Sequence, residues 1–226
     1  MGRTQLHEGR PQPRFESRMA RSVSQDRQMR GQEQGAEMRK RRESPCAPET
    51  VAVLSPLGTI RVHACESGVH AIQILMDVAP AERSAEAPPR CRVVNGGSAE
   101  TSPGLRRCVE WLQAYFGDPH SAGSLPPPAF HHPALSADMF TSRVLHVLFR
   151  DVKIGDTVSY KRLAEMAGNP RAARAVGGAM RKNPIPLIIP CHRVISSSGQ
   201  SGPYMSGRGD HLKQWLLAHE RRREEG

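Results

Sequence analysis

A cysteine and a histidine stand side by side at Cys191-His192, at the end of an apolar run. A thiolate is a strong nucleophile, and a neighbouring imidazole can accept the proton that the thiol must lose. On the dipeptide alone, a buried cysteine beside a solvated histidine is the simpler interpretation, because free cysteine usually behaves as a small buried hydrophobe. The pair is therefore a candidate nucleophile and base that needs support from the rest of the chain.

The apolar run that leads to this pair, residues 185–189, is flanked and interrupted by Pro184, Pro186 and Pro190. Proline fixes its own φ and donates no hydrogen bond. We therefore expect a stiff, extended segment, neither a helix nor a central strand, that holds Cys191-His192 in one place.

Two short helices joined by a turn precede the run and predict a helix-turn-helix. Ser159 caps the first helix, Gly168 ends it, and the second covers residues 171–180. The second helix carries alanines and a central Arg174, without the long polar side chains that read base edges in the major groove. This favours recognition of DNA shape and charge, although a small-residue helix packed on a core would have the same pattern. Each Gly of Gly177-Gly178 costs about 1 kcal/mol in a helix, so we expect close packing there.

Ahead of these helices the sequence predicts a small sheet. Val51 to Leu54, Ile60 to Ala64 and Val69 to Met76 have the composition and alternation of strands, and short turns between them indicate an antiparallel meander. Residues 79–103 are rich in Pro, Ala and Gly and predict a loose loop.

Three more segments have helical spacing. Ser102-Pro103 offers an N-cap and a first-turn proline for a helix that ends at Gly117. A second helix contains Phe140 to Leu148, and we expect Asp210 to cap the last one. The Pro-rich stretch from Leu125 to Pro133 predicts an interdomain connection.

Charge is unevenly distributed along the 226 residues, whose net charge is +10. Residues 1–44 carry a net +5, residues 45–140 a net −3 and residues 141–226 a net +8. A basic C-terminal part favours a polyanionic partner, although a solvated charged surface is the common alternative.

The first 44 residues have one aromatic side chain, so they cannot bury enough apolar area to offset the entropy of ordering, and we expect disorder. Arg39 to Arg42 form a short basic run of the kind found in nuclear-import and DNA-tethering segments. No stretch is typical of a signal peptide or membrane span. With five cysteines, an odd number, we expect an intracellular protein with reduced thiols.

Several motifs occur together in a fixed order and carry a family resemblance. The sequence resembles the methylated-DNA–protein-cysteine methyltransferases, the direct-reversal repair proteins for 6-O-methylguanine, over about residues 46–221. The motifs are Gly155 to Tyr160, Ala167 to Pro170, Ala172 to Met180, Asn183-Pro184, Ile189 to Val194 and Trp215 to Glu220.

The resemblance implies roles for four residues. Cys191 would take the methyl group, His192 would accept the thiol proton through a water, and Glu220 would orient the imidazole. Tyr160 would supply or stabilise the proton that the leaving guanine needs. Because S-methylcysteine has no easy leaving group, the reaction would occur once per molecule, irreversibly.

The target base must first leave the duplex, at a cost of a few kcal/mol. The resemblance implies that Arg174 fills the vacated stack from the minor groove, and that the carbonyl of Val194 helps to hold the base. Ser206 is the expected contact from the following loop, which is longer than usual around Met205. The remaining DNA contacts that the resemblance implies are Thr141, Tyr160, Lys161, Asn169 and Ser197, with Lys161 in place of the usual Gln.

Cys46, Cys65, His70 and His131 are too scattered to form a metal motif by spacing. The resemblance implies that they match the structural zinc ligands of animal members. Two Cys and two His would close a tetrahedral site and staple the meander to the rest of the domain. No organic cofactor is expected, and we expect Cys91 and Cys108 only to pack.

Together these observations predict an α+β protein. A disordered basic tail, residues 1–44, would precede a zinc-stapled antiparallel-sheet domain that is ribonuclease-H-like, residues 45–133. A helical, winged-helix-like DNA-binding domain with the helix-turn-helix would cover residues 134–226. The expected partner is double-stranded DNA that contains 6-O-alkylguanine, bound by a nuclear monomer with no membrane contact.

Two alternatives are a module that binds lesions without transferring anything and a Cys-His hydrolase that acts on acyl groups. The combination of Cys191, His192 and Glu220 argues against the first. The second predicts turnover, and the sequence contains no evident oxyanion-hole motif.

Overall fold

The structure, a computed structural model, describes residues 46–75, 91–95, 101–201 and 204–221. These residues all belong to one compact unit, residues 46–226. The predicted disordered tail, including the basic run from Arg39 to Arg42, lies outside the described residues. The predicted boundary at residues 133 and 134 stays a prediction.

The antiparallel meander is confirmed as β1 (Glu49–Ser55), β2 (Gly58–Cys65) and β3 (Gly68–Ile74). A fourth strand, β4 (Arg92–Asn95), pairs antiparallel with β1, which gives the order β3-β2-β1-β4. The prediction of a loose loop over residues 79–103 was therefore wrong for this segment. Four residues with a single Val-Val pair are a weak pattern, and the strand forms because β1 has a free edge to bond.

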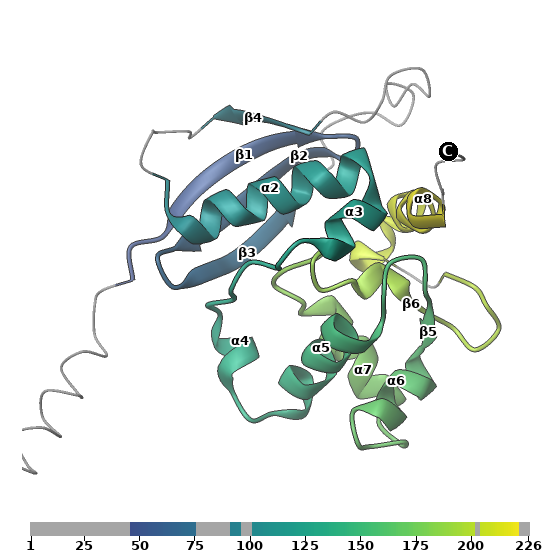
Figure 1. The fold of residues 1–226 in the computed structure, drawn as a ribbon. Helices are drawn as coiled ribbons and strands as arrows, with labels where there is room; N and C mark the ends of the chain where they lie inside the picture. The colour runs from purple at the N-terminus through teal and green to yellow at the C-terminus, as the bar shows by residue number, and fades with distance from the viewer. Residues whose placement is uncertain (1–45, 76–90, 96–100, 202–203, 222–226) are drawn as a thin grey trace, which may run out of the picture. The chain divides into compact units, whose positions relative to one another are not determined.

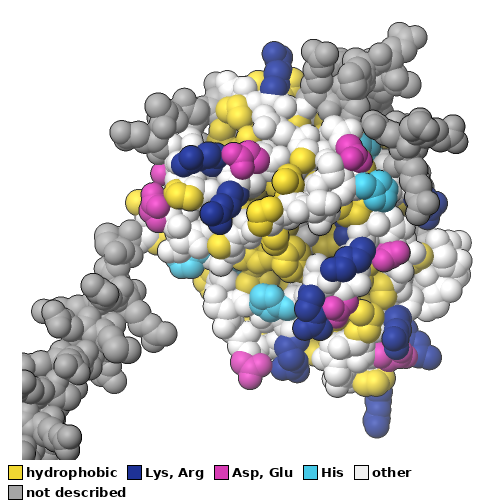
Figure 2. All heavy atoms as spheres, in the orientation of Figure 1, with side chains coloured by type: hydrophobic (Ala, Val, Ile, Leu, Met, Phe, Trp, Pro, Cys, Tyr) yellow, Lys and Arg dark blue, Asp and Glu magenta, His cyan; other side chains and the backbone are white. Residues whose placement is uncertain are grey.

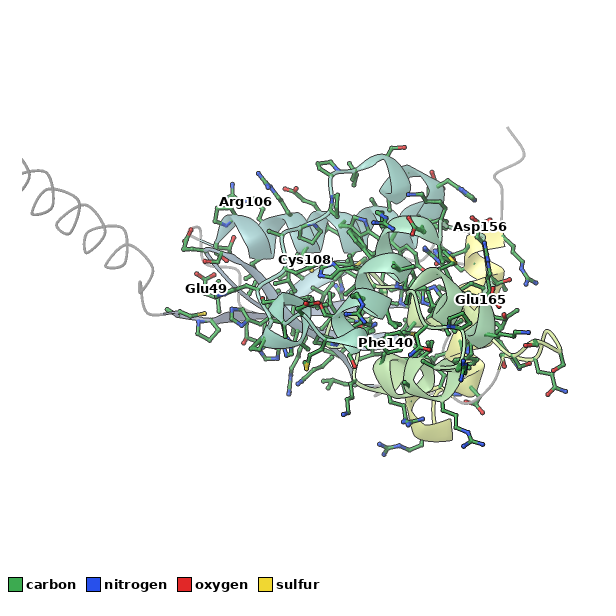
Figure 3. The ribbon with its side chains drawn as sticks, turned by 90° about the horizontal axis from the view of Figure 1, so that it is seen from below. Glu49, Arg106, Cys108, Phe140, Asp156 and Glu165 are labelled. Carbon is green, nitrogen blue, oxygen red and sulfur yellow. The ribbon has the colours of Figure 1, made fainter. Side chains whose placement is uncertain are left out.

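One helix, α2 (Pro103–Gly117), lies across a face of this sheet (Figure 1). It has the predicted bounds, and its inward residues bury against the strands; Cys108 is among them and is fully buried (Figure 3). The predicted side-chain cap by Ser102 was wrong, because Ser102 makes no cap hydrogen bond. Its backbone N–H instead donates to Oε2 of Glu49 over 3.1 Å, which ties the helix start to β1.

The Pro-rich stretch from Leu125 to Pro133 is held against the sheet by backbone hydrogen bonds. It follows the short helix α3 (Pro119–Ser124), precedes α4 (Pro133–Ser136), and runs along β3 between them. The N–H of Val69 donates to the carbonyl of Ala129, and the N–H of His131 donates to the carbonyl of Val69, both over 2.8 Å. These bonds hold the stretch on the outer edge of β3.

The helix-turn-helix is confirmed. After α5 (Phe140–Asp151) and the two-residue strand β5 (Val158–Ser159), it consists of α6 (Tyr160–Met166) and α7 (Ala173–Arg181). Ser159 caps α6 as predicted, because its hydroxyl accepts the N–H of Arg162 over 3.1 Å. Gly168 ends it with a φ of 83°, a conformation that favours glycine. The second helix begins two residues later than predicted.

The apolar run before the Cys-His pair is not extended, so that prediction was wrong. Residues 185–189 curl into turns, closed by a hydrogen bond of 3.0 Å from the N–H of Ile189 to the carbonyl of Ile185. Leu187 adopts a φ of 74°, although side chains other than glycine rarely do so. Prolines exclude helix and strand, but they leave the residues between them free to turn.

The turns lead directly into the 3-10 helix η2 (Cys191–Arg193) and the strand β6 (Val194–Ile195), which pairs in parallel with β5. A second 3-10 helix, η3 (Met205–Gly207), precedes the C-terminal α8 (Asp210–Arg221). Asp210 is the first residue of α8 and does not cap it as predicted, because its carboxylate accepts the N–H of Tyr204 over 2.7 Å. None of the described helices is long and apolar enough to span a membrane.

Candidate active site

Cys191 lies at the start of η2 and is 6% exposed. Its thiol borders a cavity of about 690 Å³ that Tyr160, Asn183, Tyr204 and Lys213 also line. Part of the cavity wall comes from β3, through Ile72, Gln73 and Ile74. The candidate nucleophile is therefore reached through a cavity to which both the sheet and the helical part contribute.

Burial raises the pKa of the Cys191 thiol above its usual range. Hydrogen bonds from Asn183 and Tyr204 and the positive charge of Lys213 act in the opposite direction but do not outweigh burial. The sulfur lies 3.9 Å from the hydroxyl of Tyr204. The resting group is thus a thiol at neutral pH, and it needs a base before it can attack.

His192 is the candidate for that base. Its ring is fully buried, and Nε2 lies 2.7 Å from Oε1 of Glu220. Nδ1 is buried and has no hydrogen-bond partner among the described residues. Burial lowers the pKa of His192 more than Glu220 raises it. The imidazole is neutral at pH 7, with Nε2–H donated to Glu220 and Nδ1 free to accept a proton.

The carboxylate of Glu220 is buried and fully hydrogen-bonded. Arg193 donates two hydrogen bonds, from Nε–H to Oε2 over 2.8 Å and from Nη2–H to Oε1 over 2.9 Å. The backbone N–H of Gly155 donates to Oε2 over 3.3 Å. The hydroxyl of Tyr115 donates to Oε1 over 2.7 Å. Burial favours the neutral acid, but His192 and Arg193 hold the pKa of Glu220 far below its usual range. The group therefore stays an anion that can stabilise an imidazolium.

Tyr160, the first residue of α6, lies half-buried on the cavity wall. Burial and the neighbouring Cys191 raise the pKa of its hydroxyl, and the charge of Arg181 offsets part of that rise. The hydroxyl therefore keeps its proton at neutral pH, as a hydrogen-bond or proton donor must.

The two base-pocket residues, Val194 and Ser206, stay predictions. Val194 is fully buried, and its carbonyl accepts Nζ of Lys213 over 2.7 Å, one of two lone pairs on that oxygen. Lys213 also donates to the carbonyl of Ser201 and so ties the following loop to β6. The side chain of Ser206 lies outside the described part of the chain, so its predicted contact stays a prediction.

The predicted DNA contacts lie on the helix-turn-helix and its surroundings. Lys161, Asn169, Arg174 and Ser197 are exposed on α6, the turn, α7 and the loop after β6, and Thr141 is half-buried on α5. On the face drawn in Figure 2, Lys and Arg side chains gather over the helical part of the molecule, with acidic groups between them.

The predicted close packing at Gly177-Gly178 was wrong. A Cβ on either glycine would meet only the guanidinium of Arg181, at 3.9 and 4.0 Å. The glycines lie half-buried on the surface of α7, next to the cavity that Gly177 lines. The cost of glycine in this helix is therefore not offset by packing within the described protein.

The four predicted metal ligands, distant in sequence, come together at one end of the sheet. Their ligand atoms all lie within 4.8 Å of one another, and the four residues are Cys46, Cys65, His70 and His131. Sγ of Cys46 is 3.2 Å from Nε2 of His70, and Sγ of Cys65 is 3.2 Å from Nδ1 of His131. Burial opposes ionisation of Cys65, yet hydrogen bonds with both histidines lower its pKa to about 6.

Sequence reasoning missed several residues around the cavity. Arg193 and Asn183 were quoted only as parts of motifs, although both contact the reactive segment. Tyr204 lies just before η3 and Lys213 lies on α8, and no local sequence pattern reveals that these segments approach Cys191. Tyr115 was assigned only to the apolar face of a helix, because a buried tyrosine gives no sign in sequence of what its hydroxyl contacts.

Comparison with known proteins gives a consistent result. Residues 139–222 match the family model described as 6-O-methylguanine DNA methyltransferase, DNA binding domain. The methylated-DNA–protein-cysteine methyltransferase of Mus musculus is 51% identical over 166 residues, which cover 74% of this chain and 78% of the mouse protein. The protein of that name from Homo sapiens is 45% identical over 175 residues, or 77% of this chain and 81% of the human one.

Solved structures are similar as well. The O6-methylguanine methyltransferase of Mycobacterium tuberculosis has a TM-score of 0.56 and 30% identity, covering 77% of this chain and 93% of its own. The structure of Mycobacterium tuberculosis OGT in complex with DNA has a TM-score of 0.55 and 30% identity, with 75% of this chain and 91% of that chain covered.

Proposed function

Because the chain belongs to the methylated-DNA–protein-cysteine methyltransferase family, we propose that Cys191 is the residue that accepts the alkyl group. The protein repairs 6-O-alkylguanine in DNA by transferring the alkyl group to itself. The observation that carries the assignment is the buried relay from the Cys191-His192 pair to Glu220, which ends at the cavity. Only Cys191 among the described cysteines borders that cavity.

The chemistry begins with a proton transfer and a displacement. A water between the two side chains carries the thiol proton of Cys191 to Nδ1 of His192, and Glu220 stabilises the imidazolium. The thiolate then attacks the methyl carbon: the S–C bond forms, the C–O bond breaks, and its electron pair stays on the guanine oxygen.

The leaving guanine is neutralised by a proton that Tyr160 supplies or shares. Its raised pKa keeps the phenol protonated until the purine becomes basic. The thiol proton that His192 holds then returns through water to the Tyr160 phenolate, so the net change is one methyl moved to sulfur and one proton moved to guanine. No described group is placed to cleave the thioether, and each molecule reacts once.

The substrate is double-stranded DNA, approached from the minor groove. Arg174 on the exposed face of α7 would enter the stack that the flipped base leaves, and the open surface at Gly177-Gly178 would let the DNA backbone come close. Lys161, Asn169, Thr141 and Ser197 would contact the backbone around it. We further propose that the protein acts as a monomer in the nucleus.

A structural zinc ion fits the cluster of Cys46, Cys65, His70 and His131. Tetrahedral bonds of about 2.3 Å to sulfur and 2.0 Å to nitrogen place such ligands about 3.5 Å apart. The observed sulfur–nitrogen distances are 3.2, 3.2 and 3.8 Å. Four protein ligands leave no open position, so zinc would stabilise the fold and take no part in transfer. Metal analysis of the purified protein should give one zinc per chain, and its absence would refute this part.

The assignment of Cys191 is tested by peptide mapping after incubation with a duplex that carries 6-O-methylguanine. We expect one methyl group on the peptide that contains Cys191 and none in Cys191→Ala. Cys108→Ala is the matched control, because that thiol is fully buried on the sheet-facing side of α2 and should leave transfer intact. Methyl on another residue would refute the assignment. Unchanged protein with normal DNA binding would favour a lesion-binding module, and catalytic turnover would favour a hydrolase.

A further inference from the structure

The carboxylate oxygen that faces the catalytic base is shared among three donors. Oε1 of Glu220 accepts Nε2–H of His192 and the hydroxyl of Tyr115, each over 2.7 Å, and Nη2–H of Arg193 over 2.9 Å. Tyr115 belongs to α2, which packs on the sheet, whereas His192 and Glu220 belong to η2 and α8. A residue 105 positions away from Glu220 in sequence therefore completes the relay.

The phenol of Tyr115 is held in this position from several sides. It is fully buried, its ring stacks on Trp111 at 5.1 Å with an interplanar angle of 12°, and it meets Phe116 edge-on at 5.3 Å. Its backbone carbonyl lies 2.8 Å from Nε2 of His219 on α8. Figure 1 shows α8 beside the end of α2. A ring packed this way cannot turn its hydroxyl away from the carboxylate without disturbing the core.

We propose that Tyr115 is a positioning residue for alkyl transfer, whose hydroxyl fixes Glu220 and limits how strongly this carboxylate attracts a proton to His192. The inference rests on the proposed function of the same site. A neutral donor that bonds to a carboxylate stabilises the anion and reduces the basicity of that oxygen. With the bond in place, the imidazole stays neutral in the resting protein and can accept the thiol proton when substrate arrives.

Arg193 also donates to Oε1, so the phenol adds to the effect of a charged donor on this oxygen. His192 faces Glu220 and Lys213 from α8 and Arg193 from η2. Glu220 faces Arg193, the N–H of Gly155 and the phenol. Arg193 pairs with the carboxylate of Glu220. Lys213 bonds to the carbonyls of Val194 and Ser201 and so holds the loop between them. Besides His192 itself, the described side chains that bond Oε1 directly are the charged Arg193 and the uncharged Tyr115.

Tyr115→Phe tests the proposal, because it removes one oxygen and keeps the ring. The freed oxygen should attract the His192 proton more strongly, so the pKa of His192 rises. The acid limb of the pH profile of the transfer rate constant should move up by about half to one pH unit. On that limb the variant should react about threefold to tenfold more slowly than wild type, with nearly equal rates at pH 8. NMR titration of the His192 ring should record the same upward shift.

Two further variants separate positioning from packing. Trp111→Phe disturbs the stacked ring but leaves the hydroxyl, so it should lower the melting temperature without moving the acid limb. Replacement of Tyr115 by 3-fluorotyrosine makes the phenol a stronger donor at almost the same volume, so the limb should move down. This second variant gives an answer even if Tyr115→Phe does not fold.

The proposal is overturned if folded Tyr115→Phe keeps both the wild-type limb and the wild-type His192 titration, or if Trp111→Phe moves the limb equally. An unchanged limb in the fluorotyrosine protein also counts against it. Failure of the proposed function is a separate result, because it would be seen in wild-type protein that transfers no methyl group to Cys191.

Discussion

At the scale of single residues, the site keeps its nucleophile inactive until a base acts. Burial makes Cys191 a thiol, and burial also makes His192 a neutral imidazole that can take its proton. The anion of Glu220 is maintained against burial by the charges around it. The three groups therefore form a relay in which each protonation state is the one needed for the first step.

Replacing Glu220 by Gln should slow methyl transfer by about a hundredfold or more, because the imidazolium loses its counter-charge. Arg193 would remain buried with its bond to the carbonyl of Val152 but without a counter-charge, at a cost of about 3 to 5 kcal/mol in the free energy of unfolding. Single-turnover kinetics and urea unfolding at pH 7 measure the two effects.

The pH dependence of stability supplies the check on this variant. A carboxyl whose pKa is depressed in the folded state stabilises the fold above its unfolded pKa, about 4.3, and loses that contribution as pH falls through the folded value. The stability gap between wild type and Glu220→Gln should therefore narrow below about pH 4. A gap that is the same at pH 3 and pH 7 would contradict the ion-pair account.

The residue types in the sequence drew attention to the Cys191-His192 pair, whereas Glu220 and the roles of all three residues came only from the family resemblance. Neither predicted Tyr115, because what a buried hydroxyl contacts depends on how two helices far apart in sequence meet. The four zinc-cluster residues were found only through resemblance, since their spacing of up to 85 residues between Cys46 and His131 forms no local pattern.

At the scale of elements, the site is held by short segments that lie between the four-stranded sheet and the helix-turn-helix. The turns of residues 185–189, η2 and β6 place Cys191 and Val194, while α8 brings Lys213 and Glu220 to them. Periodicity predicted the longer elements well: α2 has the predicted bounds, and β1 to β3 form the expected meander. Periodicity failed for β4, which forms because it pairs with β1. It also failed for the apolar run of residues 185–189, which turns at Leu187 through a strained φ.

Gly68, at the start of β3, is the position where an element depends most on glycine. Its φ is 144°, and an added Cβ would lie 2.5 Å from the carbonyl oxygen of Ala129. Gly68→Ala should cost about 3 kcal/mol or more and displace the segments that carry His70 and His131. Thermal unfolding and metal analysis should show a lower melting temperature and weaker zinc retention.

Gly117→Ala is the matched control, since a Cβ there meets nothing within 4 Å among the described residues. This variant should unfold near the wild-type temperature and retain zinc. Equal behaviour of the two alanine variants would show that the approach of β3 to Ala129 does not hold the metal cluster together.

At the scale of the whole molecule, a net charge of +10 suits a partner that is a polyanion, and the positive charge is concentrated in residues 141–226. Phosphate contacts are sequence-independent and release counterions, so their number sets the salt dependence of binding. Charge and shape would bring the protein to DNA, while the cavity and its relay would select the damaged base.

Lys161→Ala should weaken binding to methylated and unmethylated duplexes equally, and it should reduce the slope of log K against log salt by about 0.9. Fluorescence anisotropy at several salt concentrations measures both quantities. Arg107→Ala removes the same charge from an exposed site on α2 and should leave the slope unchanged. If both variants lowered the slope alike, net charge rather than a phosphate contact at Lys161 would be the cause.

The most direct test of the central claim is a count of methyl groups removed per protein molecule in the presence of excess 6-O-methylguanine duplex, with free Cys191 thiol measured in parallel. We predict that repair stops at one methyl per chain and that the Cys191 thiol disappears in equal amount. Continued repair beyond one equivalent, or loss of the lesion while the Cys191 thiol remains free, would contradict the account.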